Sequence, residues 1–407
     1  MAGMVIIGGG LAAGGAAETL RSEGYEGDIT VIADEAHSPY QRPPLSKGFL
    51  KGEEGLDAVI LHSDDWYREQ HIDVRTGLAA TAVHPDAHTV DLADGTTLGY
   101  DKLLLATGSS PRVLPIPGHD LPGVHMLRRL DDSEALKAQL SGGGRKLVLI
   151  GSGWIGMEVA ATARQLGNEV VILERDPVPL AVALGDEMGN VFRRLHEENG
   201  VDLRTSVNVE RIEGADRATG VVVDGETVPA DLVLIGVGAI PNTKLAEDAG
   251  IDVDHGILTD PSLRTSAADV LAAGDVANAM HPVLGQRLRS EHWANALNGG
   301  PVAAKVMLGQ DAEHDMIPYF YTDQFDLGME LSGFPPLMNG AELVIRGDLN
   351  TREFIAFWVQ GARVVGGMNV NIWDVNEAIQ KLVRSGAGVD PRALADPSVD
   401  LDGLAGA

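Results

Sequence analysis

The sequence predicts an α/β protein that carries a further α+β domain at its C-terminal end. Two stretches carry the α/β prediction. Near residue 4 and again near residue 146, an apolar run leads into a glycine cluster, a helix of small residues and a second apolar run. From Pro318 the composition changes, because aromatic residues and turn signals replace that pattern. We expect one discontinuous domain of residues 1–115 and 242–317, a domain of residues 116–241 inserted into it, and a third of residues 318–407.

Composition limits the classes of function. The 407 residues are 44% hydrophobic, enough for two or three domains with real cores. A formal charge of −28 is unfavourable for a nucleic-acid partner or an anionic membrane surface. We find no charged-then-apolar leader and no apolar run of transmembrane length, so a cytoplasmic location is expected.

The chain contains no cysteine. A redox-active disulfide, a peroxidatic cysteine and a thiolate-ligated iron-sulfur centre all need a sulfur nucleophile or ligand. Those activities are therefore excluded for this polypeptide. No pattern of metal ligands stands out, and we expect no metal site.

The first glycine cluster has the layout of a dinucleotide-binding βαβ unit. Gly8 makes the tight turn, Gly10 lets the backbone approach a pyrophosphate, and Ala13 takes the third position, where Gly or Ala permits close helix packing. The phosphates would lie at the helix N-terminus. Asp34, or Glu35 beside it, follows the second strand and would bind the ribose. A glycine-rich loop alone is more often an ordinary turn, but strand, helix and acid all stand at the expected distances.

A stiff loop follows this unit. Pro43 and Pro44 precede Leu45, Ser46 and Lys47, so a cation is delivered on a rigid segment that ends in a helix start. The simpler interpretation is a structural connection. Residues 83–101 alternate and turn at residues 94–95, which predicts a hairpin. Residues 103–108 then predict a buried parallel strand that ends in glycine.

The second glycine cluster is complete. Gly151, Gly153 and Gly156 occupy all three positions, and Glu174 closes the second strand. A carboxylate accepts hydrogen bonds from a free ribose 2′-hydroxyl and repels a 2′-phosphate, so we favour NADH over NADPH. The neighbouring Arg175 keeps NADPH open.

The rest of the chain supplies further candidates. Hairpins are expected over residues 207–228, and Gly238 follows the next buried strand. Asp275 ends another short strand, where an Asp is often a helix N-cap or, alternatively, binds the ribityl chain of a flavin. A helix is expected from about Glu291 to Leu308, and its N-terminal dipole would favour negative charge on a flavin. The last helix is expected near residues 375–385.

The order of these motifs resembles the FAD-containing, NADH-dependent ferredoxin reductases of oxygenase systems. Four features match in order over nearly the whole chain: both glycine clusters, the segment Pro43 to Lys47, the Ala-Thr-Gly and Ala-Gly-Asp strands, and the aromatic-Asp-Gln stretch at residues 319–324. The segment Pro43 to Lys47 and the aromatic-Asp-Gln stretch are specific to this family. The other two features occur throughout the wider disulfide-reductase-like superfamily.

The resemblance implies FAD in the first unit and NADH in the inserted one. It places FAD contacts at Ala12, Asp34, Arg42, Lys47, Ala80, Arg128, Asp275 and Trp293. It places NAD contacts at Ile155, Gly156, Glu174 and Gly238, with Glu158 near the nicotinamide and Lys47. The chain departs from the family where Tyr319 and Tyr321 replace Trp, and where Ala13 replaces a glycine.

The expected reaction is hydride transfer from NADH to FAD, followed by two one-electron transfers to a ferredoxin with a two-iron two-sulfur cluster that feeds an oxygenase. Lys47 and Glu158 are the candidate catalytic residues, because a paired ammonium beside the flavin would stabilise charge on its reduced form. An exposed lysine without a role is the alternative. Two other functions stay open. One is an NADH oxidase or another direct small-molecule reductase, and the other is a redox-sensing interaction flavoprotein like apoptosis-inducing factor.

Overall fold

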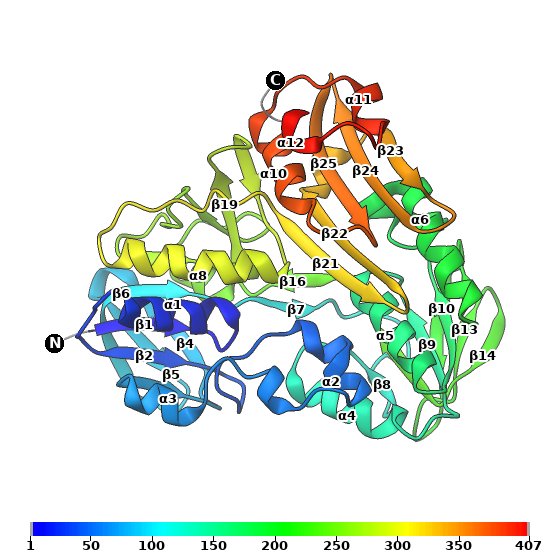
Figure 1. Ribbon diagram of the computed structural model, residues 1–407. Helices are drawn as coiled ribbons and strands as arrows, with labels where there is room; N and C mark the ends of the chain where they lie inside the picture. Colours follow the sequence, from blue (N-terminus) through cyan, green and yellow to red (C-terminus); the bar gives the residue numbers. More distant parts are fainter. Residues whose placement is uncertain (1–2, 405–407) are drawn as a thin grey trace. The chain divides into compact units, whose positions relative to one another are not determined.

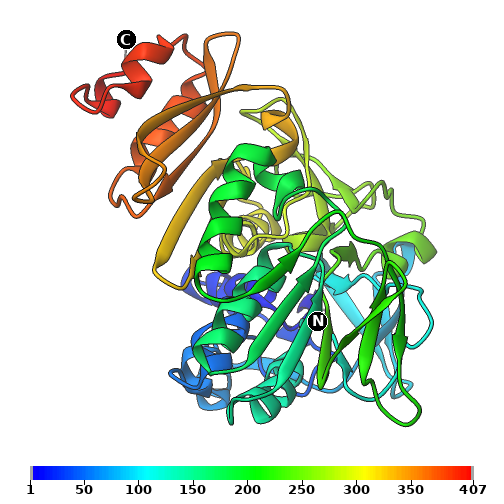
Figure 2. The same ribbon diagram turned by 90° about the vertical axis from the view of Figure 1, so that its right-hand side faces the viewer.

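The computed structural model describes residues 3–404 (Figures 1 and 2). The chain is divided into two compact units. The first contains the residues up to Pro43 together with Gly55–Ser110 and Ala239–Pro318. The second contains Pro44–Glu54, Pro111–Gly238 and the chain from Tyr319. The three-domain division given above stays a prediction.

The first unit is built on a sheet with a parallel and an antiparallel part. The parallel strands, in spatial order, are β3 (Ile72–Arg75), β2 (Ile29–Ile32), β1 (Gly3–Ile7), β6 (Thr97–Leu105) and β18 (Val270–Ala272). On the antiparallel side, β5 (Thr89–Leu92) pairs with β6, and β4 (Ala80–His84) pairs with β5. β1 is buried along its whole length, as expected for a parallel strand that is covered on both faces.

Two helices of small residues pack against each other in this unit. α1 (Leu11–Ser22) lies beside α8 (Trp293–Met307), and Figure 1 shows them in blue and yellow. A Cβ atom on Gly300 would lie 2.3 Å from the carbonyl oxygen of Ala12. The close approach of α1 and α8 therefore depends on the absence of a side chain at residue 300.

The remaining elements of the first unit are short. They are η2 (Leu56–Ala58), α3 (Asp64–Glu69), η3 (Pro85–Ala87), α7 (Lys244–Asp248), β17 (Ile257–Thr259), η4 (Gly274–Val276), β19 (Ala277–His281) and β20 (Gln286–Leu288). The strands β17, β19 and β20 form a three-stranded sheet, and β7 (Ser109–Pro111) pairs with β16 (Ala239–Pro241).

β6 joins two predictions into one strand. Its first residues pair with β5 in the predicted hairpin, and its last residues pair in parallel with β1. The sequence predicted a hairpin and a separate buried strand, whereas the structure has a single nine-residue strand from Thr97 to Leu105. One strand thus serves both parts of the sheet.

The second unit repeats the parallel arrangement. Its sheet has the spatial order β11 (Asp202–Arg204), β10 (Glu169–Leu173), β9 (Lys146–Ile150), β15 (Leu232–Ile235) and β8 (Val124–His125). An antiparallel meander of β12 (Val209–Glu213), β13 (Gly220–Val223) and β14 (Glu226–Pro229) fills the stretch where hairpins were expected. The helices are α2 (Gly48–Lys51), α4 (Leu130–Leu140), α5 (Trp154–Gln165) and α6 (Ala181–Glu198), and η1 (Pro43–Ser46) precedes α2.

The C-terminal part of this unit is an antiparallel sheet of β21 (Tyr319–Gln324), β22 (Leu327–Gly333), β25 (Arg363–Val370), β24 (Glu353–Gln360) and β23 (Glu342–Asp348). Figure 2 shows this sheet in orange beside the red helices. α10 (Asn376–Ser385) packs on β22 and β25, where the last helix was expected. The short helices are α9 (Pro335–Met338), α11 (Pro391–Ala395) and α12 (Leu401–Leu404).

Two absences hold for residues 3–404. No helix there combines the length and apolarity that crossing a membrane requires. Nor does that part of the chain bring three His, Asp or Glu side chains together as metal ligands.

Candidate functional site

The first glycine loop joins β1 to α1. Gly8 has a φ of +139°, and a Cβ atom there would lie 2.1 Å from the carbonyl oxygen of Ala106, at the end of β6. The protein itself therefore requires glycine at this turn. A Cβ atom on Gly10 would meet no atom within 4 Å, so no steric conflict within the protein requires glycine there. A group bound against the backbone would explain it, and the α1 N-terminus has no side-chain cap and no acid in its first turn.

The second glycine loop has the same construction between β9 and α5. Gly151 has a φ of +99°, and its Cβ would lie 2.5 Å from the carbonyl oxygen of Gly236. The space around Gly153 is again open, because a Cβ atom there would lie 4.0 Å from its nearest neighbour, the same oxygen. A Cβ atom on Gly156 would lie 2.6 Å from the Gly151 oxygen. The first unit accommodates Ala13 at the matching position, fully buried.

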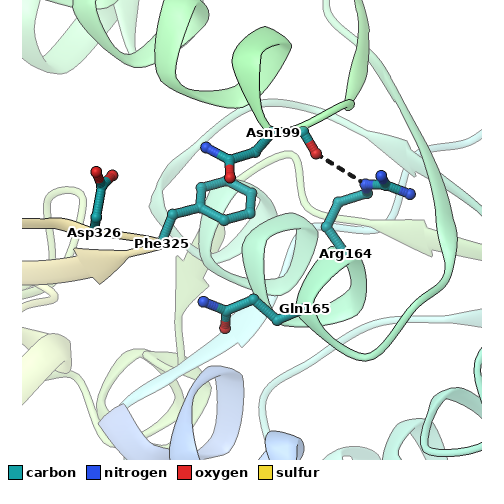
Figure 3. Close-up of a pocket in the computed structure, with 5 residues that line it drawn as sticks. All are labelled: Arg164, Gln165, Asn199, Phe325 and Asp326. Atoms are coloured by element: carbon teal, nitrogen blue, oxygen red, sulfur yellow. Dashed lines mark hydrogen bonds between the residues drawn. The ribbon is translucent and has the colours of Figure 1, made fainter.

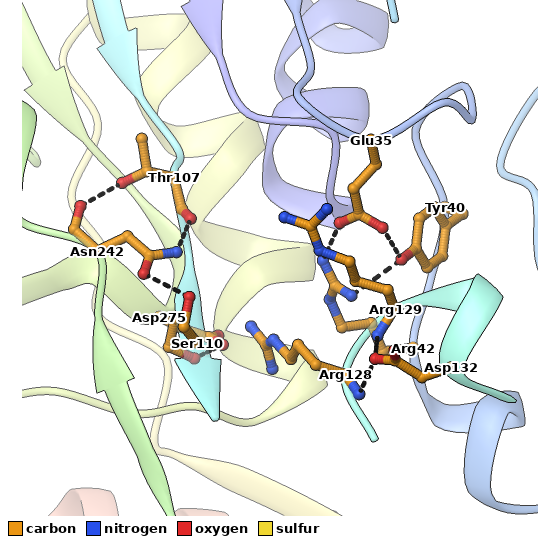
Figure 4. Close-up of polar contacts among 11 residues, drawn as sticks. Glu35, Tyr40, Arg42, Thr107, Ser110, Arg128, Arg129, Asp132, Asn242 and Asp275 are labelled. Carbon is orange, nitrogen blue, oxygen red and sulfur yellow. Dashed lines mark hydrogen bonds and ion pairs between the residues drawn. The ribbon is translucent and has the colours of Figure 1, made fainter. Parts of the chain in front are cut away.

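The two acids after β2 differ in their surroundings. Glu35 accepts hydrogen bonds from the hydroxyl of Tyr40 and from Arg42, whose Nη2 lies 3.0 Å from Oε1 (Figure 4). Asp34 is exposed at the end of the strand. Glu35 thus holds Arg42 in place. Contacts of Asp34, Glu35 and Arg42 with FAD stay predictions.

Glu174 closes β10 and contacts the glycine loop. Its Oε2 accepts hydrogen bonds from the backbone nitrogen and the hydroxyl of Ser152 at 2.7 and 2.6 Å, and its Oε1 accepts one from the nitrogen of Asp176 at 2.8 Å. A carboxylate offers about four lone-pair positions. These three bonds leave capacity for a ribose hydroxyl. The side chain of Arg175 is 87% exposed, and its Nε lies 3.7 Å from Asp176.

Lys47 and Glu158 form a buried ion pair. Lys47 Nζ lies 2.7 Å from Glu158 Oε1, and the two side chains are 18% and 5% exposed. The hydroxyl of Ser46 donates to Glu158 Oε2 at 2.5 Å, and Thr322 donates to Oε1 at 2.7 Å. The ammonium also lies 5.5 Å from the ring centroid of Tyr321. The expected pairing of Lys47 with Glu158 is present, and its part in a reaction stays a prediction.

Ser46 is itself anchored at its backbone. Its carbonyl oxygen accepts a hydrogen bond of 2.8 Å from Thr162, on the same helix as Glu158. The neighbouring Leu45 carbonyl accepts one of 2.7 Å from Ser133 at the start of α4. These bonds make the loop before Lys47 rigid, as its prolines predict.

Asp275 lies inside η4, directly after β18. Its carboxylate accepts a hydrogen bond of 2.9 Å from the hydroxyl of Ser109 and is 8% exposed. The N-cap residue of η4 is Ala273, so the interpretation of Asp275 as a helix N-cap is wrong. The φ of Gly274 is +78°, and its Cβ would lie 3.2 Å from that of Ala12. Gly274, the residue before Asp275, therefore packs against the N-terminal turn of α1.

The start of α8 carries two aromatic groups. The indole nitrogen of Trp293 donates to Gln41 Oε1 at 3.1 Å, which fixes the ring. His292 precedes it as the N-cap residue, without a side-chain capping bond. Burial lowers the pKa of His292 to about 4. The imidazole is therefore neutral at pH 7.

The remaining predicted cofactor contacts lie in four separate elements or loops. Ala80 begins β4, and the backbone nitrogen of Arg128 donates to Asp132 at 2.9 Å ahead of α4 (Figure 4). Ile155 is 42% exposed in the first turn of α5. Gly238 has a φ of +104°, and its oxygen accepts a bond from the nitrogen of Arg112. Their contacts with FAD or NAD stay predictions.

Several residues in contact with the predicted ones were missed. Ser46 lies in the segment Pro43 to Lys47, and Thr322 lies in the aromatic-Asp-Gln stretch. Their places in these two family-specific motifs could have marked them as site residues. Asn242 follows β16 and makes three hydrogen bonds of 2.8 Å (Figure 4). Its carbonyl oxygen accepts from the Thr107 hydroxyl, its side-chain nitrogen donates to the Thr107 carbonyl, and its side-chain oxygen accepts from the Ser110 hydroxyl. Nothing in the sequence links residues so far apart.

The chain matches two family models. One is described as pyridine nucleotide-disulphide oxidoreductase and covers residues 3–300, and the other is described as reductase C-terminal and covers residues 319–405. The chain belongs to the pyridine nucleotide-disulphide oxidoreductase family. The predicted fold class, two dinucleotide-binding parts plus a C-terminal α+β part, is confirmed.

Relatives within this family match over their full length. Rhodocoxin reductase of Rhodococcus erythropolis is 37% identical over 401 residues, with 98% of this chain and 93% of that protein covered. A ferredoxin–NAD(+) reductase component of an anthranilate 1,2-dioxygenase system from Burkholderia cepacia is 38% identical, with 98% of each covered. The reductase in a covalent putidaredoxin reductase–putidaredoxin complex superposes with a TM-score of 0.94 at 34% identity, covering 99% and 98%. The predicted resemblance to ferredoxin reductases of oxygenase systems and the class of oxidoreductase are confirmed.

Proposed function

We propose that this protein passes electrons from NADH through FAD to a small iron-sulfur ferredoxin, which feeds an oxygenase. Two complete dinucleotide loops in a chain without cysteine carry this proposal. Two redox dinucleotides bound to one chain exchange electrons with each other, and a chain without thiols offers no disulfide to receive them. The electrons then leave for another protein. Among the relatives, one is named as a reductase of rhodocoxin and another as the ferredoxin–NAD(+) reductase component of a dioxygenase system.

FAD is assigned to the first unit and NADH to the second. The open space at Gly10 and the uncapped start of α1 fit a pyrophosphate, and Gly274, the residue before Asp275, packs against that turn. The open space at Gly153 and the carboxylate of Glu174 fit a dinucleotide with a free 2′-hydroxyl. FAD, when bound, accepts a hydride and gives up electrons singly, which is the chemistry that joins NADH to a one-electron carrier.

Lys47 supplies a fixed positive charge. Glu158 and the ring of Tyr321 hold the ammonium, and the bonded Ser46 backbone holds the loop before it. A charge that is positioned in advance stabilises negative charge on a neighbouring group without reorganisation. We propose this as the role of Lys47, with Glu158 as its partner.

The N-terminus of α8 adds a second source of positive electrostatic potential, which favours negative charge on a bound flavin. This fifteen-residue helix begins at Trp293, with the neutral His292 as its N-cap residue, and a helix N-terminus carries partial positive charge. Because His292 is neutral and partly buried, it contributes packing and hydrogen bonding. Hydride transfer needs no general acid or base from it.

The partner is proposed to be a ferredoxin with a two-iron two-sulfur cluster. NADH is the proposed donor, because Glu174 opposes a 2′-phosphate. A cytoplasmic location remains a prediction.

The test follows NADH oxidation by the purified flavoprotein with and without an iron-sulfur ferredoxin. We expect a yellow flavin spectrum and turnover that depends on the ferredoxin. Rapid NADH oxidation with oxygen alone would instead establish an NADH oxidase. Binding of NADH that alters association while electron transfer stays negligible would establish the redox-sensing alternative.

A further inference from the structure

A line of buried polar side chains continues from the Lys47–Glu158 pair into α6. Thr322 Oγ1 donates to Glu158 Oε1 at 2.7 Å, and Gln324 Nε2 donates to Thr322 Oγ1 at 3.2 Å. His196 Nε2 lies 2.9 Å from Gln324 Oε1. The three side chains beyond Glu158 are at most 1% exposed. Thr322 and Gln324 stand two residues apart on β21 and therefore share one face of the strand.

The hydrogen bonds along this line have one direction. A threonine hydroxyl has a single proton, which Thr322 gives to the carboxylate, so it must accept from the amide of Gln324. The amide oxygen then faces His196, which must carry its proton on Nε2. All three donors thus point toward Glu158. Among residues 3–404, His196 Nδ1 has no hydrogen-bond partner.

The far end of the line is closed to solvent. The ring of His196 meets Phe325 edge-on, with ring centroids 5.1 Å apart. Phe325 lines a surface pocket of about 390 Å³ with Arg164, Gln165, Asn199 and Asp326 (Figure 3). Burial lowers the pKa of His196 to about 4, so the imidazole stays neutral at pH 7.

Two simpler explanations fit less well. A proton path is excluded as the purpose, because a proton would have to pass through the amide of Gln324. A role in core packing alone does not explain these residues, because Leu or Val would fill the same space without the free energy that burial of polar groups requires. The ordered direction of the bonds, toward one carboxylate, needs its own explanation.

We propose that Thr322, Gln324 and His196 are positioning residues that hold Glu158, and through it Lys47, in one arrangement. This inference rests on the role proposed above for Lys47, a fixed charge that stabilises reduced FAD. Three donors aimed at Glu158 add positive potential at the ion pair and restrict movement of the carboxylate. The expected effect is a higher midpoint potential of bound FAD than the ion pair would give without the line.

The test uses Thr322→Val, which removes the hydroxyl and keeps the shape, and Thr322→Ser, which restores it. The matched control is Thr259→Val in the first unit, because the buried Thr259 hydroxyl has no hydrogen-bond partner among the described residues. The midpoint potential of FAD is measured by spectroelectrochemistry, and FAD reduction by NADH is measured by stopped flow. The tautomer of His196 is read from its ¹⁵N chemical shifts at pH 7, assigned with His196→Gln.

We expect a lower midpoint potential and slower FAD reduction in Thr322→Val, at an unchanged dissociation constant for NADH. Thr322→Ser and Thr259→Val should match the unaltered protein, and His196 should be protonated on Nε2 alone. A proton on Nδ1 would overturn the proposed direction of the line. A shifted potential in Lys47→Met with none in Thr322→Val would overturn the inference and leave the function intact. No shift in either variant would overturn the proposed role of Lys47 and this inference with it.

Discussion

The ammonium of Lys47 lies 2.7 Å from the carboxylate of Glu158, which is 5% exposed. Removing two charged groups from water has a higher desolvation free energy for a buried ion pair than for a pair at the surface. The attraction between the two charges offsets this free energy only when further hydrogen bonds satisfy both groups. Ser46 and Thr322 provide those bonds. The arrangement fixes a charge in place, and this is its use in the proposed reaction.

Replacement of the cation tests this directly. In Lys47→Met we expect FAD reduction by NADH to slow by about tenfold or more, because interactions with a charged group contribute about 1.5–3 kcal/mol and 1.36 kcal/mol corresponds to a factor of ten. Stopped-flow absorbance of the flavin measures the rate. Lys244→Met is the matched control, since that lysine pairs with Asp248 at the surface. Equal rates and equal midpoint potentials in Lys47→Met and the control would remove Lys47 from the mechanism.

The two glycines of the first loop are expected to respond differently to alanine. Gly10→Ala meets open space in an extended backbone, so the apoprotein should lose no more than about 1 kcal/mol of unfolding free energy, from a poorer N-cap. FAD affinity should fall strongly. Gly8→Ala meets the Ala106 oxygen at a positive φ and should destabilise the apoprotein by about 1–3 kcal/mol or more. Urea unfolding and flavin fluorescence titration separate the two, and full FAD binding by Gly10→Ala would contradict the assignment.

Cofactor preference is expected to depend on Glu174. Glu174→Gln keeps an oxygen for the Ser152 hydroxyl and removes the charge that opposes a 2′-phosphate. The ratio of kcat/KM for NADH to that for NADPH should drop by about tenfold, in line with the loss of one charged hydrogen bond. The exposed Glu169, at the start of the strand that Glu174 follows, provides the control Glu169→Gln. A ratio that stays constant would show that Glu174 serves only to brace the loop.

Burial of His196 predicts a dependence of stability on pH. Its pKa is lowered from 6.5 to about 4, so between these values the unfolded chain binds a proton that the folded protein does not. The free energy of unfolding should therefore fall as the pH drops from about 6.5 to 4, by up to about 3 kcal/mol from this residue. In His196→Gln the slope over this window should be shallower. His255 is 93% exposed, so His255→Asn should keep the original slope, and an identical slope in His196→Gln would refute the prediction.

The sequence predicted the parts whose signal is local. Each dinucleotide loop joins consecutive elements, so glycine spacing and flanking apolar runs are sufficient to place Gly8 and Gly151. Glu174 could be placed for the same reason, because it directly follows the second strand of its dinucleotide-binding unit. The pairing of Lys47 with Glu158 came from a family resemblance and not from spacing.

Contacts between distant segments were beyond the sequence. The hydrogen bond that Ser109 donates to Asp275 and the one that Trp293 donates to Gln41 depend on how strands and helices meet, which no local pattern encodes. α6 was also missed. Gly185, with a φ of 75° and a ψ of 177°, interrupts its first turns and obscures the helical period.

α5 combines two tasks in twelve residues. Gly156 packs against the second dinucleotide loop, and Glu158, two positions later on the same rigid rod, grips Lys47. If α5 shifts when a phosphate binds at its N-terminus, Glu158 shifts with it, and the ammonium of Lys47 moves because it is paired with Glu158. The affinity of the second unit for its dinucleotide and the position of the Lys47 charge are therefore expected to be coupled, so that a substitution in α5 that changes one would also change the other.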